Sequence, residues 1–252
     1  YEIKQFNKGP ADSRNIGVEK SCYDTICFLD ADDYWSPTKL EKQVSYLQKF
    51  PEINIFSNNV ISVKNDKIIG KRFDKEKVFL KTGVNEGIVE NYIRTSGRYA
   101  FHPPSAIMVK KKLFEKYGKF NVNLKSVEDS EIVLRWIING EKIYYNDDPV
   151  VFYETANFSS LTKNIDLWCE NHFKYWMEIS TKKLSKNQKE LFLKMKKSTL
   201  LQSLIVIIKR GEGNCARKYI ILHFKELFSL KLILIFFFSL LPINIYLKIF
   251  RK

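Results

Sequence analysis

Short apolar runs alternate with polar segments through the first two thirds of the chain. Residues 26–29 form an apolar run that ends abruptly in acidic residues, and residues 106–109 form a second such run. Runs of this length between polar residues predict strands buried in a sheet. Residues 51–63 are again rich in apolar and β-branched residues and predict a further strand.

A helix is predicted between the strand at residues 26–29 and the strand within residues 51–63. Ser36 and Pro37 have the residue types of a helix start, with serine as the N-cap and proline as the first helical residue. Leu40, Val44 and Leu47 then repeat at helical spacing. Strands that alternate with helices in this way predict an α/β domain.

Three carboxylates follow the strand predicted at residues 26–29, namely Asp30, Asp32 and Asp33. In open α/β sheets, ligands bind beyond the carboxyl ends of the strands, where these side chains would emerge. Acids this close repel one another unless a positive group lies among them, and Mg²⁺ or Mn²⁺ is often shared between carboxylates and substrate phosphates. A metal–phosphate site is one interpretation, and a polar loop after a strand is the other.

Four motifs follow one another in a fixed order. The pattern G-x-x-x-x-R-N-x-G occupies residues 9–17, and FLDADDYWSPTKLEKQ occupies residues 28–43. A Gly-Lys-Phe turn lies at residues 118–120, and the acidic pair at residues 128–129 opens a predicted helix for which Gly140 is the expected stop. In this order and at these separations, the motifs resemble the family 2 glycosyltransferases over residues 1–160.

The resemblance implies a GT-A fold, a Rossmann-like α/β sheet that binds a nucleotide-sugar together with Mn²⁺ or Mg²⁺. By that analogy Asp30 would contact the ribose or the metal, and Asp32 would coordinate the metal at the diphosphate. Arg14 would lie near the nucleotide. Asp129 would be the general base that deprotonates the acceptor hydroxyl, with Glu128 as its orienting partner, and the reaction would invert the anomeric centre.

Two of these assignments have ordinary structural alternatives. An acid in the first turn of a helix, such as Asp129, interacts favourably with the helix dipole whether or not it is catalytic. His102, which precedes the strand at residues 106–109, could touch the acceptor or the departing phosphates, although a loop histidine more often only bonds the backbone.

The chain also departs from the family pattern. It starts at Tyr1, and the family's opening strand and helix have no counterpart, so we expect an N-terminally truncated domain whose own activity is in doubt. Arg135-Trp136 is present, but Ile132 stands where the Gln-x-x-Arg-Trp element of processive synthases has glutamine. The resemblance therefore implies transfer of a single sugar, not polymerisation.

The charge is divided unevenly along the chain. Residues 1–180 hold 26 basic and 25 acidic side chains, whereas residues 181–252 hold 16 basic and 3 acidic ones. This break predicts a transferase domain at 1–180 and a basic, amphipathic helical appendage at 181–252. The appendage has no nucleic-acid-binding motif and no aromatic stacking platform, so nucleic acid is not the expected partner.

The appendage contains an apolar segment at residues 232–241, which Pro242 and Asn244 interrupt. A segment of ten residues is about half of what a spanning helix needs. Basic residues flank the segment, so a helix in the membrane interface is the favoured interpretation, with a core helix and a marginal transmembrane anchor as the alternatives. We therefore expect a peripheral protein on the inner, cytoplasmic face of the plasma membrane, acting on a glycan or lipid-linked acceptor in envelope polysaccharide synthesis.

Two further functions remain open from the sequence. A haloacid-dehalogenase-like phosphohydrolase also places Asp-x-Asp after a strand, but it requires threonine or valine where this chain has Tyr34. A non-catalytic, membrane-binding fragment with a degenerate transferase domain is the other alternative.

Overall fold

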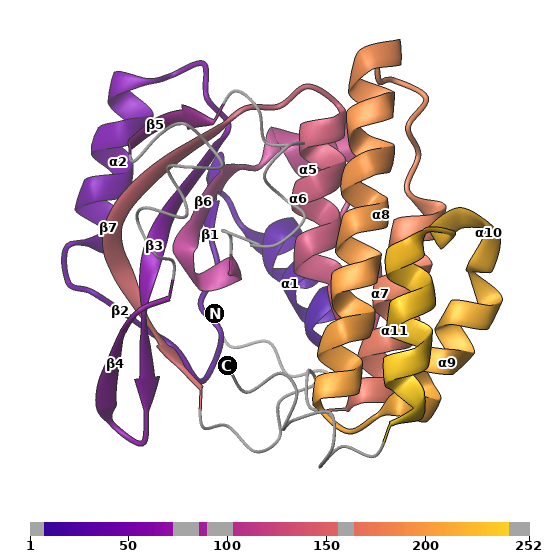
Figure 1. The fold of residues 1–252 in the computed structure, drawn as a ribbon. Helices are drawn as coiled ribbons and strands as arrows, with labels where there is room; N and C mark the ends of the chain where they lie inside the picture. Colours follow the sequence, from indigo (N-terminus) through magenta and orange to yellow (C-terminus); the bar gives the residue numbers. More distant parts are fainter. Residues whose placement is uncertain (1–7, 73–85, 90–102, 156–163, 242–252) are drawn as a thin grey trace. The chain divides into compact units, whose positions relative to one another are not determined.

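The computed structural model describes residues 8–72, 86–89, 103–155 and 164–241. The chain divides into two compact units, Tyr1–Ser185 and Lys186–Lys252. Figure 1 shows the fold, with a mixed α/β arrangement in the first unit and helices in the second.

The first unit is built on one mixed sheet. Its strands are β1 (Thr25–Cys27), β2 (Tyr34–Trp35), β3 (Ile55–Lys64), β4 (Lys67–Lys71), β5 (Glu86–Val89), β6 (Ile107–Lys110) and β7 (Ile143–Glu154). The main order is β1-β6-β3-β7-β2, with β4 paired to β3 and β5 paired to β7. The long pair β3–β7 is parallel and the other pairs are antiparallel. All three predicted strands are present, although β1 is shorter than the apolar run.

Helices cover both faces of this sheet. The first unit contains α1 (Pro10–Lys20), α2 (Lys39–Lys49), the short 3₁₀ helix η1 (Pro104–Ala106), α5 (Lys112–Tyr117), α6 (Glu128–Ile138) and α7 (Ile165–Glu178). In Figure 1, α2 lies on one side of the sheet, and α1, α5 and α6 lie on the other. The α/β class predicted from the sequence is confirmed, and α6 ends where Gly140 was expected to stop it, with φ of 96° at that glycine.

The two faces of the sheet have separate apolar clusters, as the alternation of side chains along a strand requires. In β3, Ile55 joins the cluster that includes residues of α1, α5 and α6, whereas Phe56 joins the cluster against α2. Tyr145 and Tyr144 of β7 alternate in the same way. Since most of these side chains are almost completely buried, the strands that lead into the site are held from both sides.

The start of α2 differs from the prediction. Ser36 and Pro37 form a turn before the helix, in which the Ser36 carbonyl accepts from Lys39 N at 3.0 Å, and Thr38 occupies the N-cap position. Leu40 is exposed, as is Val44 one turn later, and only Leu47 of the predicted apolar repeat packs against the sheet.

Two polar residues of α2 are instead fully buried against the sheet. The Gln43 amide donates to Ala106 O at 2.8 Å and to Asn58 Oδ1 at 3.1 Å, and its oxygen accepts from Lys39 Nζ at 2.7 Å. The Lys39 ammonium also lies 4.1 Å from the centroid of the Trp35 ring. The polar face of α2 therefore packs inward, because Asn58 and the Ala106 carbonyl need hydrogen-bond partners when they are buried.

The second unit is helical. It consists of α8 (Lys186–Lys209), α9 (Gly213–Leu222), α10 (Phe224–Leu227) and α11 (Leu230–Leu240), and both α9 and α11 contact α8. Leu191 and Leu193 of α8 are exposed. Among the helices in the described ranges, none has both the length and the apolar character that crossing a membrane requires.

Candidate functional site

The acidic loop begins three residues after β1, at the edge of the sheet where the sequence placed it. The β1 backbone pairs with β6 through the register Ile26 opposite Val109, and Phe28 continues into the apolar core. This anchoring delivers Asp30 beyond the end of the strand, where the Asp30 carbonyl accepts from Asp33 N at 3.0 Å and closes a turn. The loop is thus a compact turn fixed to a buried strand.

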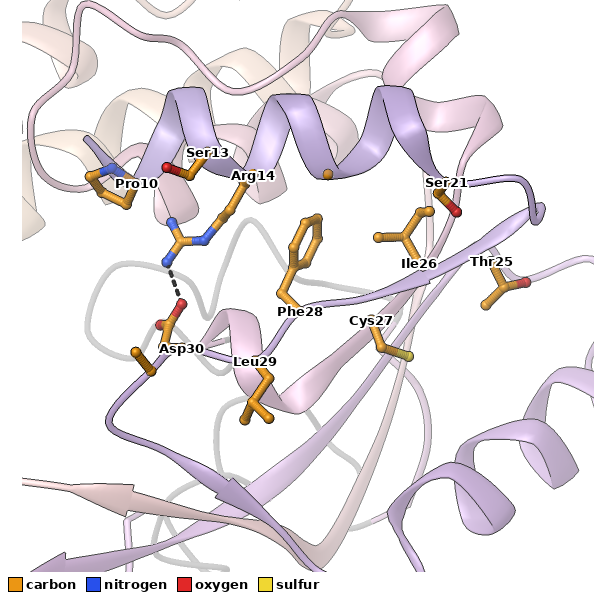
Figure 2. A pocket seen from close by; sticks show the side chains of 12 residues that line it. Pro10, Ser13, Arg14, Ser21, Thr25, Ile26, Cys27, Phe28, Leu29 and Asp30 are labelled. Atoms are coloured by element: carbon orange, nitrogen blue, oxygen red, sulfur yellow. Dashed lines mark hydrogen bonds and ion pairs between the residues drawn. The ribbon is translucent and has the colours of Figure 1, made fainter. Parts of the chain in front are cut away.

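Arg14 joins two of the sequence motifs through its guanidinium group. One nitrogen donates to Asp30 Oδ1 at 2.7 Å, and another donates to Glu128 Oε1 at 2.6 Å. Figure 2 shows Arg14 reaching down from α1 toward Asp30. Burial opposes the charge of Arg14, but attraction by Asp30 and then by Glu128 outweighs it, so the pKa of Arg14 lies above its ordinary value. The acidic loop and the start of α6 therefore share one cation.

The acidic pair lies at the first turn of α6. Val127, just before it, has φ 60° and ψ 13°, a left-handed conformation that is strained for a β-branched residue. This bend directs Glu128 into the interior, where burial and then repulsion from Asp129 raise its pKa despite the opposing effect of Arg14. Asp129 is half-buried, and its Oδ1 accepts from Ser130 N at 2.6 Å.

A second set of contacts fixes α1 against the Gly-Lys-Phe turn. The Asn15 side chain donates to Phe120 O at 2.9 Å and accepts from Phe120 N at 2.8 Å, both in the interior. From the other side, Arg135 donates to the carbonyls of Tyr117 at 2.7 Å and of Lys119 at 2.8 Å. Asn15 therefore places its neighbour Arg14, and Arg135 serves to hold the turn.

Ser105 connects the acidic loop to η1. Its hydroxyl accepts from Asp30 N at 3.1 Å and donates to Asp33 Oδ2 at 2.6 Å, while its carbonyl accepts from Trp35 Nε1 at 3.0 Å. Asp33 is 8% exposed, and its Oδ1 is buried without a hydrogen-bond partner. Burial raises the pKa of Asp33 to about 6 from its ordinary 3.8, although the hydrogen bond from Ser105 acts in the opposite direction.

This environment of Asp33 makes a prediction about stability. Between about pH 4 and pH 6 the native carboxyl keeps a proton that the unfolded chain has lost, so stability falls as the pH rises through this window. We expect the metal-free wild type to lose roughly 2–3 kcal/mol across the window relative to Asp33→Asn, which stays neutral. Urea unfolding of both proteins at the two ends of the window measures the difference.

The control for this prediction is Asp66→Asn, because Asp66 is exposed in the turn between β3 and β4 at φ 60°, a conformation that asparagine also tolerates. We expect it to follow the pH dependence of the wild type. Parallel curves for Asp33→Asn and wild type would show that Asp33 is already ionised in the folded protein.

A groove of about 620 Å³ lies between α1 and the chain from β1 into the acidic loop. Arg14 and Asp30 line it together with Pro10 and Ser13, and Figure 2 shows these four side chains gathered at the same end. Thr25 lines the groove near the start of β1. The charged groups lie at one end of the groove, the apolar side chains Ile26 and Phe28 lie along its wall, and Thr25 and Ser21 lie at the other end.

The carboxylates of the acidic loop are of the kind that binds a cation together with a phosphate. Within the described ranges there is no group of three or more histidine, cysteine, aspartate or glutamate side chains placed to hold a metal ion. Asp32 is exposed at the tip of the loop, Asp30 is partly exposed beside Arg14, and the orphaned Oδ1 of Asp33 lies buried behind them. Mg²⁺ commonly takes one or two carboxylates and completes its shell with phosphate oxygens and water.

The structure unites some of the residues expected from the sequence and leaves others apart. Arg14 contacts both Asp30 and Glu128, and Asp129 is the next residue in the same helical turn. Asp32 belongs to the same loop and is exposed. His102 lies outside the described residues, so its assignment stays a prediction.

Sequence reasoning missed Asn15 and Ser105 as parts of the site. Asn15 stands inside the G-x-x-x-x-R-N-x-G pattern, which could have pointed to it, whereas nothing in the local sequence around Ser105 distinguishes it. Its role depends on η1 lying beside the acidic loop, 75 residues away in sequence.

Comparison with known proteins gives a family match over most of the chain. The sequence model described as glycosyltransferase like family 2 matches residues 2–197. An uncharacterized glycosyltransferase of Haemophilus influenzae is 29% identical over 134 residues, which cover 52% of this chain and 42% of that protein. The matched region is thus less than half of that relative's length.

One relative has a specific activity in its name. The Escherichia coli UDP-Glc:alpha-D-GlcNAc-diphosphoundecaprenol beta-1,3-glucosyltransferase WfgD is 34% identical over 74 residues, which cover 29% of each protein. Among solved structures, S. aureus TarS 1-349 in complex with UDP-GlcNAc is 12% identical, with a TM-score of 0.48 over 86% of this chain and 70% of that one.

Proposed function

Since the chain belongs to the family described as glycosyltransferase like family 2, we propose that it transfers a single sugar from a nucleotide-sugar, with UDP as the nucleotide, to a hydroxyl of a glycan or lipid-linked acceptor. The observation that carries this proposal is the position of Arg14 between Asp30 and Glu128, which draws the acidic loop and the acidic helix start into one site. The WfgD name, with its UDP-glucose donor and diphosphoundecaprenol acceptor, supports the donor and acceptor classes.

The proposed reaction is one inverting displacement. Asp129 takes the proton of the acceptor hydroxyl, the hydroxyl oxygen bonds to the anomeric carbon from the face opposite the nucleotide, and UDP leaves with the electron pair of the broken bond. A carboxylate can serve as this base within hydrogen-bond reach of the hydroxyl. Ser130 N, which donates to Asp129 Oδ1, fixes the orientation of the carboxylate, and Glu128 beside it is held by Arg14.

The donor is proposed to bind with its diphosphate at the polar end of the groove, near Arg14 and Asp30. Asp30 and Asp32 are the residues that would hold Mn²⁺ or Mg²⁺ together with diphosphate oxygens, and such a cation neutralises the negative charge that develops on a departing diphosphate. The acceptor class suggests work at the cytoplasmic face of the plasma membrane, in the synthesis of an envelope polysaccharide.

The test is a titration of UDP into the full chain with and without Mn²⁺. We expect Mn²⁺ to strengthen UDP binding by at least about tenfold, which corresponds to one shared carboxylate–metal–phosphate contact of about 1.4 kcal/mol. In Asp32→Ala we expect UDP affinities with and without Mn²⁺ to be equal, because the exposed carboxylate of the loop is gone.

Asp148→Ala is the matched control, since Asp148 is also an exposed acid of the first unit and pairs only loosely with Lys42. It should keep the Mn²⁺ effect. If Asp32→Ala keeps the effect as well, the metal assignment fails, and if a folded wild type binds no UDP at all, the donor assignment fails for this chain.

A further inference from the structure

The second unit exposes large apolar side chains over a short stretch of chain. The exposed fractions of these side chains range from 38% to 82%. They are Ile221, Leu222, Phe224, Phe228, Leu230, Ile233, Leu234, Phe237 and Leu240, and we call them the α9–α11 apolar surface. Single exposed apolar residues are normal on proteins, but nine within twenty consecutive residues mark an interaction site.

Helical spacing divides α11 into an inner and an outer face. The inner face is formed by Leu232, Ile235 and Ser239, which are buried. The outer face is formed by Leu230, Ile233, Leu234, Phe237 and Leu240, which recur every three or four residues. A helix that is apolar on both faces needs a second apolar environment for the outer one.

Contacts within the second unit fix which face of α11 points outward. The start of α9 approaches α11 so closely that a Cβ on Gly213 would clash with Ser239 O. Arg217 also donates to Ser239 O, and at the other end Lys197 of α8 donates to Phe228 O at 2.5 Å. Because both ends of α11 are tied to its neighbours, the helix cannot turn its outer face inward without breaking these bonds.

The charge around this surface is positive. Lys218, Lys225 and Lys231 are exposed within or beside it, and Glu226 is the one acidic residue in the sequence from 213 to 241. The whole segment 186–252 has 14 basic residues and 3 acidic ones. A partner that fits must therefore combine an apolar interior with negative charge at its surface.

We propose that the α9–α11 apolar surface docks on a lipid bilayer that contains anionic headgroups, with α11 lying in the interface and its outer face among the acyl chains. Eleven helical residues at a rise of 1.5 Å span about 16 Å, whereas the hydrocarbon core is about 30 Å thick, so α11 lies in the membrane surface and does not cross it. Lysines that flank the apolar face reach the phosphates of the headgroups.

Docking on a membrane would bring the proposed transferase close to a lipid-linked acceptor. Only this link to the acceptor rests on the proposed function. Binding to vesicles needs no donor, and binding of UDP needs no lipid. The two proposals can therefore fail separately, provided that both measurements are made on the same protein.

The experiment is co-sedimentation of the full chain with vesicles of pure phosphatidylcholine and with vesicles of equal parts phosphatidylcholine and phosphatidylglycerol. We expect the wild type to bind the mixed vesicles at least about tenfold more strongly than the neutral ones, and to be released by high salt. Replacing Ile233, Leu234 and Phe237 by serine should reduce binding to mixed vesicles by at least about tenfold, because the inserted apolar area is lost.

The matched control replaces Leu191 and Leu193 of α8 by serine, since these side chains are also about half exposed but lie outside the α9–α11 apolar surface. The control should bind vesicles like the wild type, and both variants should bind UDP like the wild type. Equal vesicle binding by the triple variant and the wild type overturns the proposal. So does a wild type that ignores vesicles and forms a dimer that the triple variant cannot form, because a second copy then covers the surface.

A second measurement does not depend on the triple variant folding. Phe237→Trp keeps a large apolar side chain at the centre of the outer face, and we expect lipids with brominated acyl chains to quench the added fluorescence. Unquenched emission from this tryptophan in vesicle-bound protein would show that α11 stays outside the acyl chains, which also overturns the proposal.

Discussion

Replacement of Asp129 by asparagine is expected to lower kcat by about 10²–10⁴-fold while the affinity for UDP stays within about twofold of the wild type. Asparagine keeps the size of the side chain, and its oxygen can still accept from Ser130 N, so the first turn of α6 is preserved. What it loses is the ability to take a proton from the acceptor hydroxyl. Steady-state transfer from a UDP-sugar, together with UDP titration of the same variant, separates the two effects.

A structural effect of removing a helix-terminal charge is the competing explanation, and Asp166→Asn controls for it. Asp166 lies in the first turn of α7, is exposed, and has no part in the proposed chemistry. Loss of a dipole interaction there costs about 0.3–1 kcal/mol of stability and should leave kcat unchanged. If Asp129→Asn loses UDP binding and transfer together, Asp129 is a structural cap and not the base.

Arg14→Met is expected to reduce the free energy of unfolding by about 3–5 kcal/mol, because it leaves a buried carboxylate without its cation. The Glu128 side chain is 7% exposed and pairs with Arg14 at 2.6 Å, while Asp129 next to it adds repulsion. Methionine fills a similar volume, so the loss is mainly electrostatic. Denaturant unfolding of the two proteins measures it.

Two further proteins make this prediction specific. Lys119→Met removes the ion pair between Lys119 and Glu19, which is half-exposed and joins the same turn to α1, and should cost less than about 1 kcal/mol. Adding Glu128→Gln to Arg14→Met should restore part of the lost stability, since it neutralises the stranded acid. A double variant no more stable than Arg14→Met would mean that Arg14 acts through packing and not through charge.

Elements and parts of the site could be predicted where the sequence pattern that specifies them spans only a few neighbouring residues. The apolar run before Asp30 predicts a buried strand whose end presents acids, and the structure has β1 and the acidic turn there. The acidic pair and Gly140 mark the two ends of α6 in the same way. These local signals predict the elements correctly because a short buried strand and a helix terminus need particular residues at particular positions.

The surroundings of α2 could not be predicted in this way. Helical spacing drew attention to Leu40 and Val44, yet the structure buries Lys39 and Gln43. Lys39 donates to Gln43, and the Gln43 amide donates to Ala106 O and to Asn58 Oδ1. An apolar repeat states only that a helix has two different faces. Which face turns inward depends on the partners that the sheet offers, and those come from distant parts of the chain.

By itself, the sequence determined the α/β class, the four motifs, the family to which they belong and the basic character of residues 181–252, because composition and short-range spacing carry this information. Only the tertiary structure decided that Arg14 joins Asp30 to Glu128, that Ser105 holds the acidic loop and that the outer face of α11 remains exposed. The reason is physical: an ion pair or a buried face is a relation between residues that chain folding brings together, up to 114 positions apart in the case of Arg14 and Glu128.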